Sequence, residues 1–110
     1  MTDRELLEKA AKAMGIALHK RDIDGTPLLL LDSGVAGRGW NPITDDGDAL
    51  RLAVTLNLTN VFHPGLNQAL VRRYNDKTCE WVEDGEKHPD PYSATRRAIV
   101  RAAAAIGEQK

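Results

Sequence analysis

Apolar residues recur at helical spacing in three stretches of the chain. The first stretch begins at Thr2, and Glu5 stands three residues after it. At this spacing the Thr2 hydroxyl and the Glu5 carboxylate can accept hydrogen bonds from N–H groups at the helix start that otherwise lack partners. Gly15 follows the last apolar position and can take the left-handed conformation that ends a helix. Leucines and alanines fall on one face and charged residues on the other. We therefore predict an amphipathic outer helix.

The second stretch is almost wholly apolar and follows Thr44, which is the expected N-cap. Asn57 stands where it can end this helix. Leu50 and its apolar neighbours cover so much of the circumference that only a narrow stripe near Arg51 and Thr55 stays polar. This pattern predicts a largely buried helix, with Leu50 in the core.

The third stretch has the clearest start, because Asp90 is a favourable N-cap and Pro91 suits the first helical position. Gly107 is the expected stop. The predicted apolar face is made of Tyr92, Ile99, Ala102, Ala103 and Ile106. We expect Ile99 and Ala103 to be buried.

Two strands are predicted between the first and second helices. Residues 16–21 alternate between apolar and polar side chains, and Asp24-Gly25 is a turn dipeptide that leads to the run Leu28–Leu31. The two segments therefore predict a β-hairpin. Four consecutive leucines indicate a strand that is covered on both faces.

Three further strands are predicted between the second and third helices, at residues 59–63, 67–74 and 78–83. The turn-prone pairs Pro64-Gly65 and Asn75-Asp76 separate them, so the three strands form a β-meander. The predicted order is αββαβββα. We expect one α/β domain of the α+β kind over residues 1–110, a small sandwich in which a sheet is packed between helices.

Composition argues against several classes of protein. The net charge is −1 with 28% charged residues, which speaks against nonspecific nucleic-acid binding and against a disordered chain. The run Leu28–Leu31 is too short for a membrane helix, which needs about 20 residues, and no positively charged leader precedes the first helix. Cys79 has no partner for an internal disulfide. We expect a soluble protein in a reducing cytoplasm, without membrane contact.

Three carboxylates, those of Asp45, Asp46 and Asp48, stand at the start of the second helix. Carboxylate oxygens suit Mg²⁺ or Ca²⁺, but free N–H groups and the helix dipole favour acidic residues in a first turn without any metal. The spacing does not match a calcium loop of the EF-hand kind. We expect these residues to stabilise the helix, with no metal and no cofactor bound.

Histidine and cysteine give little support to metal or thiol chemistry. His19, His63 and His88 stand on three separate segments, with no pair at the spacing of zinc ligands. Cys79 could meet a histidine in space, yet it alternates in phase with Trp81, which is typical of a small buried thiol. We assign no catalytic residue.

The best candidate for a functional surface is the loop before the second helix. The segment from Ser33 to Gly39 contains three glycines, and Arg38, Trp40 and Asn41 lie at its end. A large ring beside an adaptable loop can anchor a ligand or a partner. It can equally act as a hydrophobic staple that holds the start of the helix. Both interpretations stay open.

Arginines supply the candidate anion sites. Arg97 and Arg101 are four residues apart on the third helix and share a face, where a phosphate or an acidic partner could bind. Arg72 and Arg73 are adjacent on a strand, so only one of them can face a given site. A solvated helix face without a partner is the default interpretation of such arginines.

Two blocks of the chain resemble a known family. They are W-N-P-x-T-D-D-G-D-A-L-R-L-A-V at residues 40–54 and A-T-R-R-A-I-V-R-A-A-A-A-I-G at residues 94–107. Both are similar to blocks of the phage ABA sandwich domain family of small phage and prophage proteins. The resemblance covers most of the chain, because the first helix and the strands fall in the same order. It implies a sheet between helical layers and a phage or prophage accessory protein, and it brings no catalytic residue with it.

The resemblance leads to an expected function, which is binding without catalysis, in counter-defence inside a bacterial host cell. One form would sequester a nucleotide immune signal, with a ring, an amide and cations as the candidate groups: Arg38, Trp40, Asn41 and Arg97. The other form would inhibit a host defence protein through acidic surface groups: Asp45, Asp46, Asp48, Glu80, Glu83, Asp84 and Glu86. The opposing alternative is a small metal-dependent hydrolase that uses Asp45, Asp46 and Asp48. Self-association into a homo-oligomer stays open.

Overall fold

The structure is a computed structural model that describes residues 2–15, 18–23, 26–31, 38–73 and 76–109, with the backbone alone for residues 18–39 and 76–80 within these ranges. The helices are α1 (Asp3–Met14), α2 (Asp46–Thr55), α3 (Pro91–Glu108) and the short 3-10 helix η1 (Gly85–Lys87). The strands are β1 (Leu18–Ile23), β2 (Thr26–Leu31), β3 (Arg38–Gly39), β4 (Leu58–His63), β5 (Gln68–Arg73) and β6 (Asp76–Asp84). They form two antiparallel sheets, with the orders β1-β2-β3 and β4-β5-β6.

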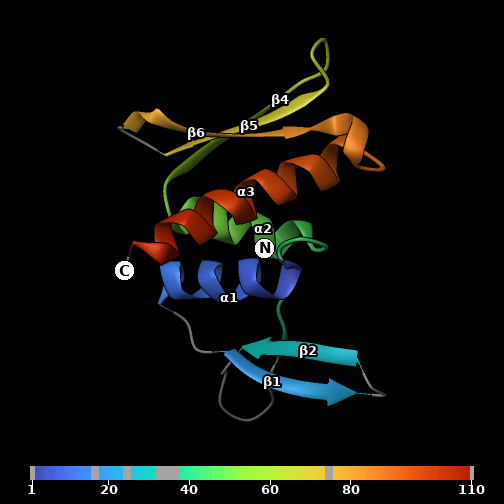
Figure 1. Cartoon of the computed structure of the whole chain (residues 1–110), viewed down its shortest axis with the longest axis vertical. Helices are drawn as coiled ribbons and strands as arrows, with labels where there is room; N and C mark the ends of the chain where they lie inside the picture. Colours follow the sequence, from blue (N-terminus) through green and yellow to red (C-terminus); the bar gives the residue numbers. More distant parts are fainter. Residues whose placement is uncertain (1, 16–17, 24–25, 32–37, 74–75, 110) are drawn as a thin grey trace.

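The helices form a layer that the sheet β4-β5-β6 covers. α3 crosses one face of this sheet, and α1 packs against α3 on the side away from it (Figure 1). α2 lies beside α3 and also contacts β4. The α+β class and the order of the elements are as predicted, with the short β3 and η1 added. The layers differ from the expected sheet between helices, because the hairpin of β1 and β2 lies beyond α1 and the described helices therefore lie between the two sheets (Figure 1).

The predicted hairpin and meander are both confirmed in the backbone. β1 pairs with β2 over residues 18–31, and β5 pairs with β4 on one side and β6 on the other. Asn67, at φ +50°, closes the turn between β4 and β5. The prediction that the leucine run is covered on both faces concerns side chains outside the described part of the structure.

Two helix starts and one helix end are confirmed at the level of single hydrogen bonds. The Thr2 hydroxyl accepts a hydrogen bond from the Glu5 N–H at 3.2 Å, and the Asp90 carboxylate accepts one from the Ser93 N–H at 2.7 Å. Gly15 ends α1 at φ +73°, in the left-handed region. Local capping chemistry therefore determines these three positions.

The predicted N-cap of the second helix is wrong by one residue. The Asp45 carboxylate accepts a hydrogen bond from the Asp48 N–H at 2.8 Å, which makes Asp45 the N-cap. Thr44 instead belongs to a turn in which its N–H bonds the carbonyl oxygen of Asn41. Two good capping residues stand side by side here, and the turn decides between them. Asn57, at φ +55°, follows the last turn of α2, as expected.

The prediction that Gly107 ends the third helix is wrong, because Gly107 lies inside that helix. α3 runs on to Glu108, and Gly107 is buried. A Cβ at this position would lie 1.9 Å from the carbonyl oxygen of Lys9, on α1. The backbones of α1 and α3 approach each other so closely at this position that only glycine, which has no side chain, fits between them.

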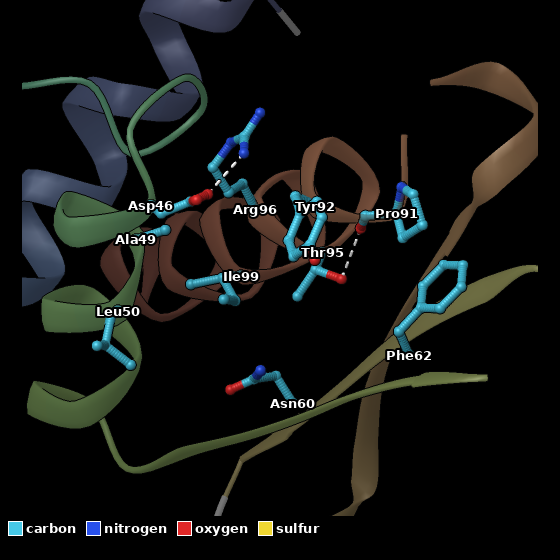
Figure 2. A pocket seen from close by; sticks show the side chains of 10 residues that line it. All are labelled: Asp46, Ala49, Leu50, Asn60, Phe62, Pro91, Tyr92, Thr95, Arg96 and Ile99. Atoms are coloured by element: carbon cyan, nitrogen blue, oxygen red, sulfur yellow. Dashed lines mark hydrogen bonds and ion pairs between the residues drawn. The ribbon is translucent and has the colours of Figure 1, made fainter. Parts of the chain in front are cut away.

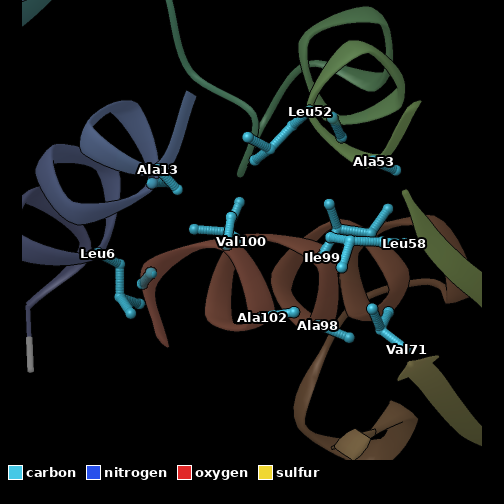
Figure 3. Packing of buried hydrophobic residues seen from close by; sticks show 14 of the residues in the cluster. Leu6, Ala13, Leu52, Ala53, Leu58, Val71, Ala98, Ile99, Val100 and Ala102 are labelled. Carbon is cyan, nitrogen blue, oxygen red and sulfur yellow. The ribbon is translucent and has the colours of Figure 1, made fainter. Parts of the chain in front are cut away.

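One continuous core lies between the helices and the sheet (Figure 3). α3 supplies its centre, with Ile99, Ala103 and Val100 buried, so the prediction for the first two is confirmed. Leu52 of α2 and Val71 of β5 pack on opposite sides of α3 and are fully buried (Figure 3). None of the described helices is long and apolar enough to cross a membrane.

Leu50, which the sequence predicts to be buried, and Tyr92, which it places on an apolar helix face, are both exposed. Leu50 is 62% and Tyr92 is 68% exposed. α2 packs through Ala49, Leu52 and Ala53, which lie on one side of the helix, and no described element covers Leu50 or Val54. The prediction of a largely buried second helix is therefore wrong, because periodicity does not tell how many sides of a helix have neighbours.

Candidate binding cleft

A hollow of about 450 Å³ opens between α2, β4 and the first half of α3 (Figure 2). α2 and β4 contribute Asp46, Ala49, Leu50, Asn60 and Phe62. α3 contributes Pro91, Tyr92, Thr95, Arg96 and Ile99. We refer to this hollow as the cleft.

The floor of the cleft is apolar, and two large apolar side chains flank its mouth. Ile99 and Ala49 are buried beneath it, while Leu50 and Tyr92 stand exposed at its sides. Phe62 points into it from β4 (Figure 2). Large exposed apolar side chains beside a concave apolar surface are typical of sites that bind a ligand or a protein.

The cationic group of the cleft donates three hydrogen bonds to neighbouring acceptors. The Arg96 guanidinium donates to the Ile43 carbonyl oxygen at 2.8 Å, to Asp46 Oδ1 at 2.6 Å and to Ser93 Oγ at 3.0 Å. The Arg96 side chain is 16% exposed and that of Asp46 is 73% exposed. Arg96 therefore holds the start of α2 against α3, and the exposed charge at this end of the cleft is the carboxylate.

The predicted acidic group holds the start of α2 together. Asp48 is buried and accepts hydrogen bonds from the Asn41 N–H and from Arg51, both at 3.1 Å. Asp45 is the N-cap and Asp46 pairs with Arg96. Within the described residues, no group of three or more His, Cys, Asp or Glu side chains is placed to hold a metal ion.

Trp40 belongs to the core. Its side chain is only 4% exposed and packs in the main hydrophobic cluster. The Asn41 side chain accepts a hydrogen bond from the Ile43 N–H at 3.0 Å, which shapes the turn before α2. Of the two interpretations of Trp40, the structure supports packing in the core and not an exposed ring that binds a ligand or a partner. The Arg38 side chain and most of the glycine-rich loop lie outside the described residues.

Arg97 and Arg101 face different parts of the molecule. Arg97 pairs with Asp3 of α1 at 2.5 Å, and Arg101 pairs with Glu83 of β6 at 2.5 Å. Arg101 also donates to the Val82 carbonyl oxygen at 3.0 Å. The two guanidinium groups therefore tie α3 to two other elements, and the structure does not bring them together as one anion site.

The second predicted acidic group is partly buried. Glu83 accepts from Arg101 and lies 2.8 Å from Nε2 of His88. Partial burial raises the pKa of Glu83, but the hydrogen bonds from His88 and Arg101 together lower it more, so the pKa lies below its ordinary value. Asp84 caps η1 by accepting from the Glu86 N–H. The side chains of Glu80, Cys79 and His19 lie outside the described part.

No protein-family model, no curated protein and no solved structure matches this chain. A function must therefore be inferred from the residues of the chain itself.

The apolar residues that line the cleft were missed as site residues. The sequence pattern places Leu50 and Tyr92 on apolar helix faces and Asn60 and Phe62 on a strand, and nothing in this pattern marks them as neighbours. One local signal was available, because Tyr92 follows Pro91 in the first turn of a helix, where fewer elements surround a side chain. The other residues meet only because β4 returns beside α2 and α3.

Proposed function

We propose that the protein acts by binding, and that the cleft receives an apolar segment of a partner protein. The observation that carries this proposal is the exposure of Leu50 and Tyr92 on the two sides of an apolar hollow. Exposing two large apolar side chains to water is unfavourable, and a partner that covers them regains the free energy of burial. The partner contributes apolar side chains that fill the space above Ile99.

A protein partner fits this cleft better than a nucleotide. Phosphate recognition needs a cation with free donors directed at the ligand, whereas Arg96 already donates to three acceptors. Trp40 is buried, and Arg97 is paired with Asp3. The described residues that suited a nucleotide signal are thus engaged elsewhere.

The second part of the proposal concerns the organism in which the protein acts and the partner that it binds. The resemblance to the phage ABA sandwich domain family supports a phage or prophage accessory protein that works in the cytoplasm of a bacterial host. We therefore propose that its partner is a host defence protein, which it inhibits through the cleft. Of the predicted acidic groups, Asp48 and Glu83 are largely buried and paired, whereas Asp45, Asp46, Asp84 and Glu86 are exposed. We place the binding element in the apolar cleft because Leu50 and Tyr92 are exposed there.

The proposal is tested in bacteria that carry single defence systems, with the plating efficiency of a phage that each system blocks as the readout. The intact chain should restore plating against one system, and the variants Leu50→Glu and Tyr92→Ala should lose this effect. Val54→Glu is the matched control, because Val54 is 67% exposed on the same helix and does not line the cleft.

Two results would contradict the proposal. One is restored plating that persists in both cleft variants when their melting curves match that of the parent. The other is that the intact chain restores plating against no system and that native mass spectrometry of the chain purified from infected cells finds no protein bound to it.

A further inference from the structure

β4 has a free edge in the described part of the structure. β5 pairs with it along residues 58–63, and no described strand pairs on its other side. Thr59, Asn60 and Val61 are all exposed, so this edge is open to solvent. Alternate residues of an antiparallel strand direct their N–H and C=O groups to opposite sides. The open edge therefore presents main-chain donors and acceptors that another strand can bond.

This edge runs beside the cleft. Asn60 and Phe62 alternate on β4 and both line the hollow, and Figure 2 shows their side chains directed into it. A strand laid alongside β4 would point every second side chain to the same face of the sheet. Those side chains would enter the space between Leu50 and Tyr92.

We propose that the partner segment binds as an additional strand on the edge of β4 and places alternate apolar side chains in the cleft. This inference rests on the proposed function and specifies the form of its partner. Main-chain hydrogen bonds to the edge supply affinity, and the cleft selects the side chains. A helical segment would leave the polar groups of the edge without partners.

The charge of the cleft defines one further property of the segment. At the α2 end, the carboxylate of Asp46 lines the cleft and its side chain is 73% exposed, while the Arg96 side chain with which it pairs is only 16% exposed. The remaining lining of the cleft carries no other charged side chain. Charge complementarity therefore places a lysine or an arginine of the segment at this end, with apolar residues at every second position beyond it.

The experiment selects displayed random peptides of about 12 residues, long enough to pair along a typical strand, on the immobilised full chain. An enriched sequence is then synthesised and labelled, and its affinity is measured by fluorescence anisotropy. We expect alternating apolar residues with a basic residue at one end. Affinity should fall by about tenfold or more in Leu50→Glu and in Tyr92→Ala, and should be unchanged in the control Val54→Glu.

Amide hydrogen exchange, followed by NMR, tests the strand itself. In the free chain, the β4 amides that bond β5 should exchange slowly and the alternating amides of the free edge should exchange fast. On binding the selected peptide, the fast β4 amides should slow by about tenfold or more. This alternation is a signature that burial of the cleft alone does not produce.

The outcomes separate the inference from the proposed function. If the peptides require Leu50 and Tyr92 but leave exchange in β4 unchanged, strand addition is wrong and the cleft remains the binding site. If no sequence is enriched, or if both cleft variants bind the peptide with the affinity of the parent chain, the proposed function fails and the inference fails with it. If edge amides of the free chain become protected as its concentration rises, a second copy occupies the edge and the inference of a partner segment is overturned.

Discussion

The two halves of α3 pack in opposite ways. In its C-terminal half, Gly107 lies so close to α1 that a Cβ would meet the Lys9 carbonyl oxygen at 1.9 Å. In its N-terminal half, Tyr92 and Arg96 line an open cleft of about 450 Å³ (Figure 2). Small residues let two helix backbones come into contact, whereas large side chains that no described element covers leave an open cleft. One helix thus has a closed half that stabilises the fold and an open half that is available for binding.

The largest effect is expected from a charge placed where the two halves meet. Ile99 is buried at the floor of the cleft and also contributes to the core. Ile99→Asp buries an unpaired carboxylate, which costs several kcal/mol, so we expect loss of soluble folded protein. The yield of soluble protein and a thermal melt followed by circular dichroism measure this loss.

Tyr92→Asp is the control for this variant, because Tyr92 is on the same helix and exposed. It should melt cooperatively near the parent temperature. A soluble Ile99→Asp variant with an unchanged melt would show that the floor of the cleft is open to water.

The closed half is tested by Gly107→Ala. The added methyl group meets the Lys9 backbone, and overpacking of this kind costs about 2 to 3 kcal/mol, which exceeds the roughly 1 kcal/mol that alanine gains in helix propensity. Urea denaturation measures the loss. Gly65→Ala is the matched control, because nothing lies within 4 Å of a Cβ at Gly65. Equal stability of the two variants would contradict the close contact of α1 and α3.

Asp48→Ala tests the hydrogen bonds that hold the start of α2, the helix that lines the cleft opposite the open half of α3. Removal of the buried carboxylate leaves the Asn41 N–H without its acceptor, and such a loss costs about 1.5 kcal/mol. Asp46→Ala removes an exposed carboxylate and should cost at most about 0.5 kcal/mol. Denaturation of both variants gives the difference. A larger loss for Asp46→Ala would mean that the ion pair with Arg96, rather than the Asp48 hydrogen bonds, holds α2 in place.

A smaller, pH-dependent effect is expected from Glu83, which ties β6 to the middle of α3. Its pKa is lower when folded than when unfolded, so its contribution is present above the ordinary pKa of 4.5 and is lost as the pH falls through the folded value. The melting temperature of the parent should therefore drop below pH 4.5, and Glu83→Gln should flatten this part of the curve. Glu86→Gln is the control, because Glu86 is exposed. Identical pH curves for parent and Glu83→Gln would rule out this contribution.

The smallest effect on stability is expected at the mouth of the cleft. Leu50 is exposed, so Leu50→Glu should change the free energy of unfolding by no more than about 0.5 kcal/mol. Urea denaturation of this variant beside Leu52→Ala, which opens a cavity in the core and costs about 3 kcal/mol, sharpens the contrast between open and closed surfaces. A loss of similar size in both would mean that Leu50 closes the cleft in solution.

Prediction from the sequence succeeded where neighbouring residues decide the structure. The N-caps Thr2 and Asp90, the left-handed Gly15, the hairpin and the meander all follow from chemistry within a few residues. It failed by one residue at Thr44, where Asp45 offers an equally good cap. Among the Asp residues at the start of α2, the preference of a helix start for carboxylates accounts for the N-cap Asp45, whereas the pairing of Asp46 with Arg96 depends on the tertiary structure.

The candidate site could not be predicted in the same way. Leu50 and Tyr92 continue the apolar patterns of their helices, and Trp40 follows a loop as an exposed ring would. Leu50 and Tyr92 are nevertheless exposed, and Trp40, for which the sequence leaves both interpretations open, is buried. Burial depends on which element lies opposite each residue. For the same reason, Arg97 and Arg101 share a helix face in sequence and yet pair with different elements.

The sequence by itself determined the class of the fold, the order of its elements and most of their ends, since capping, turns and periodicity act over a few residues. Only the tertiary structure decided that Gly107 is a contact between helices, that Trp40 is core, and that α2, β4 and α3 enclose a cleft beside a free strand edge. The physical reason is that burial is a property of pairs of surfaces, and the chain brings those surfaces together from positions about 50 residues apart, such as Asp46 and Arg96.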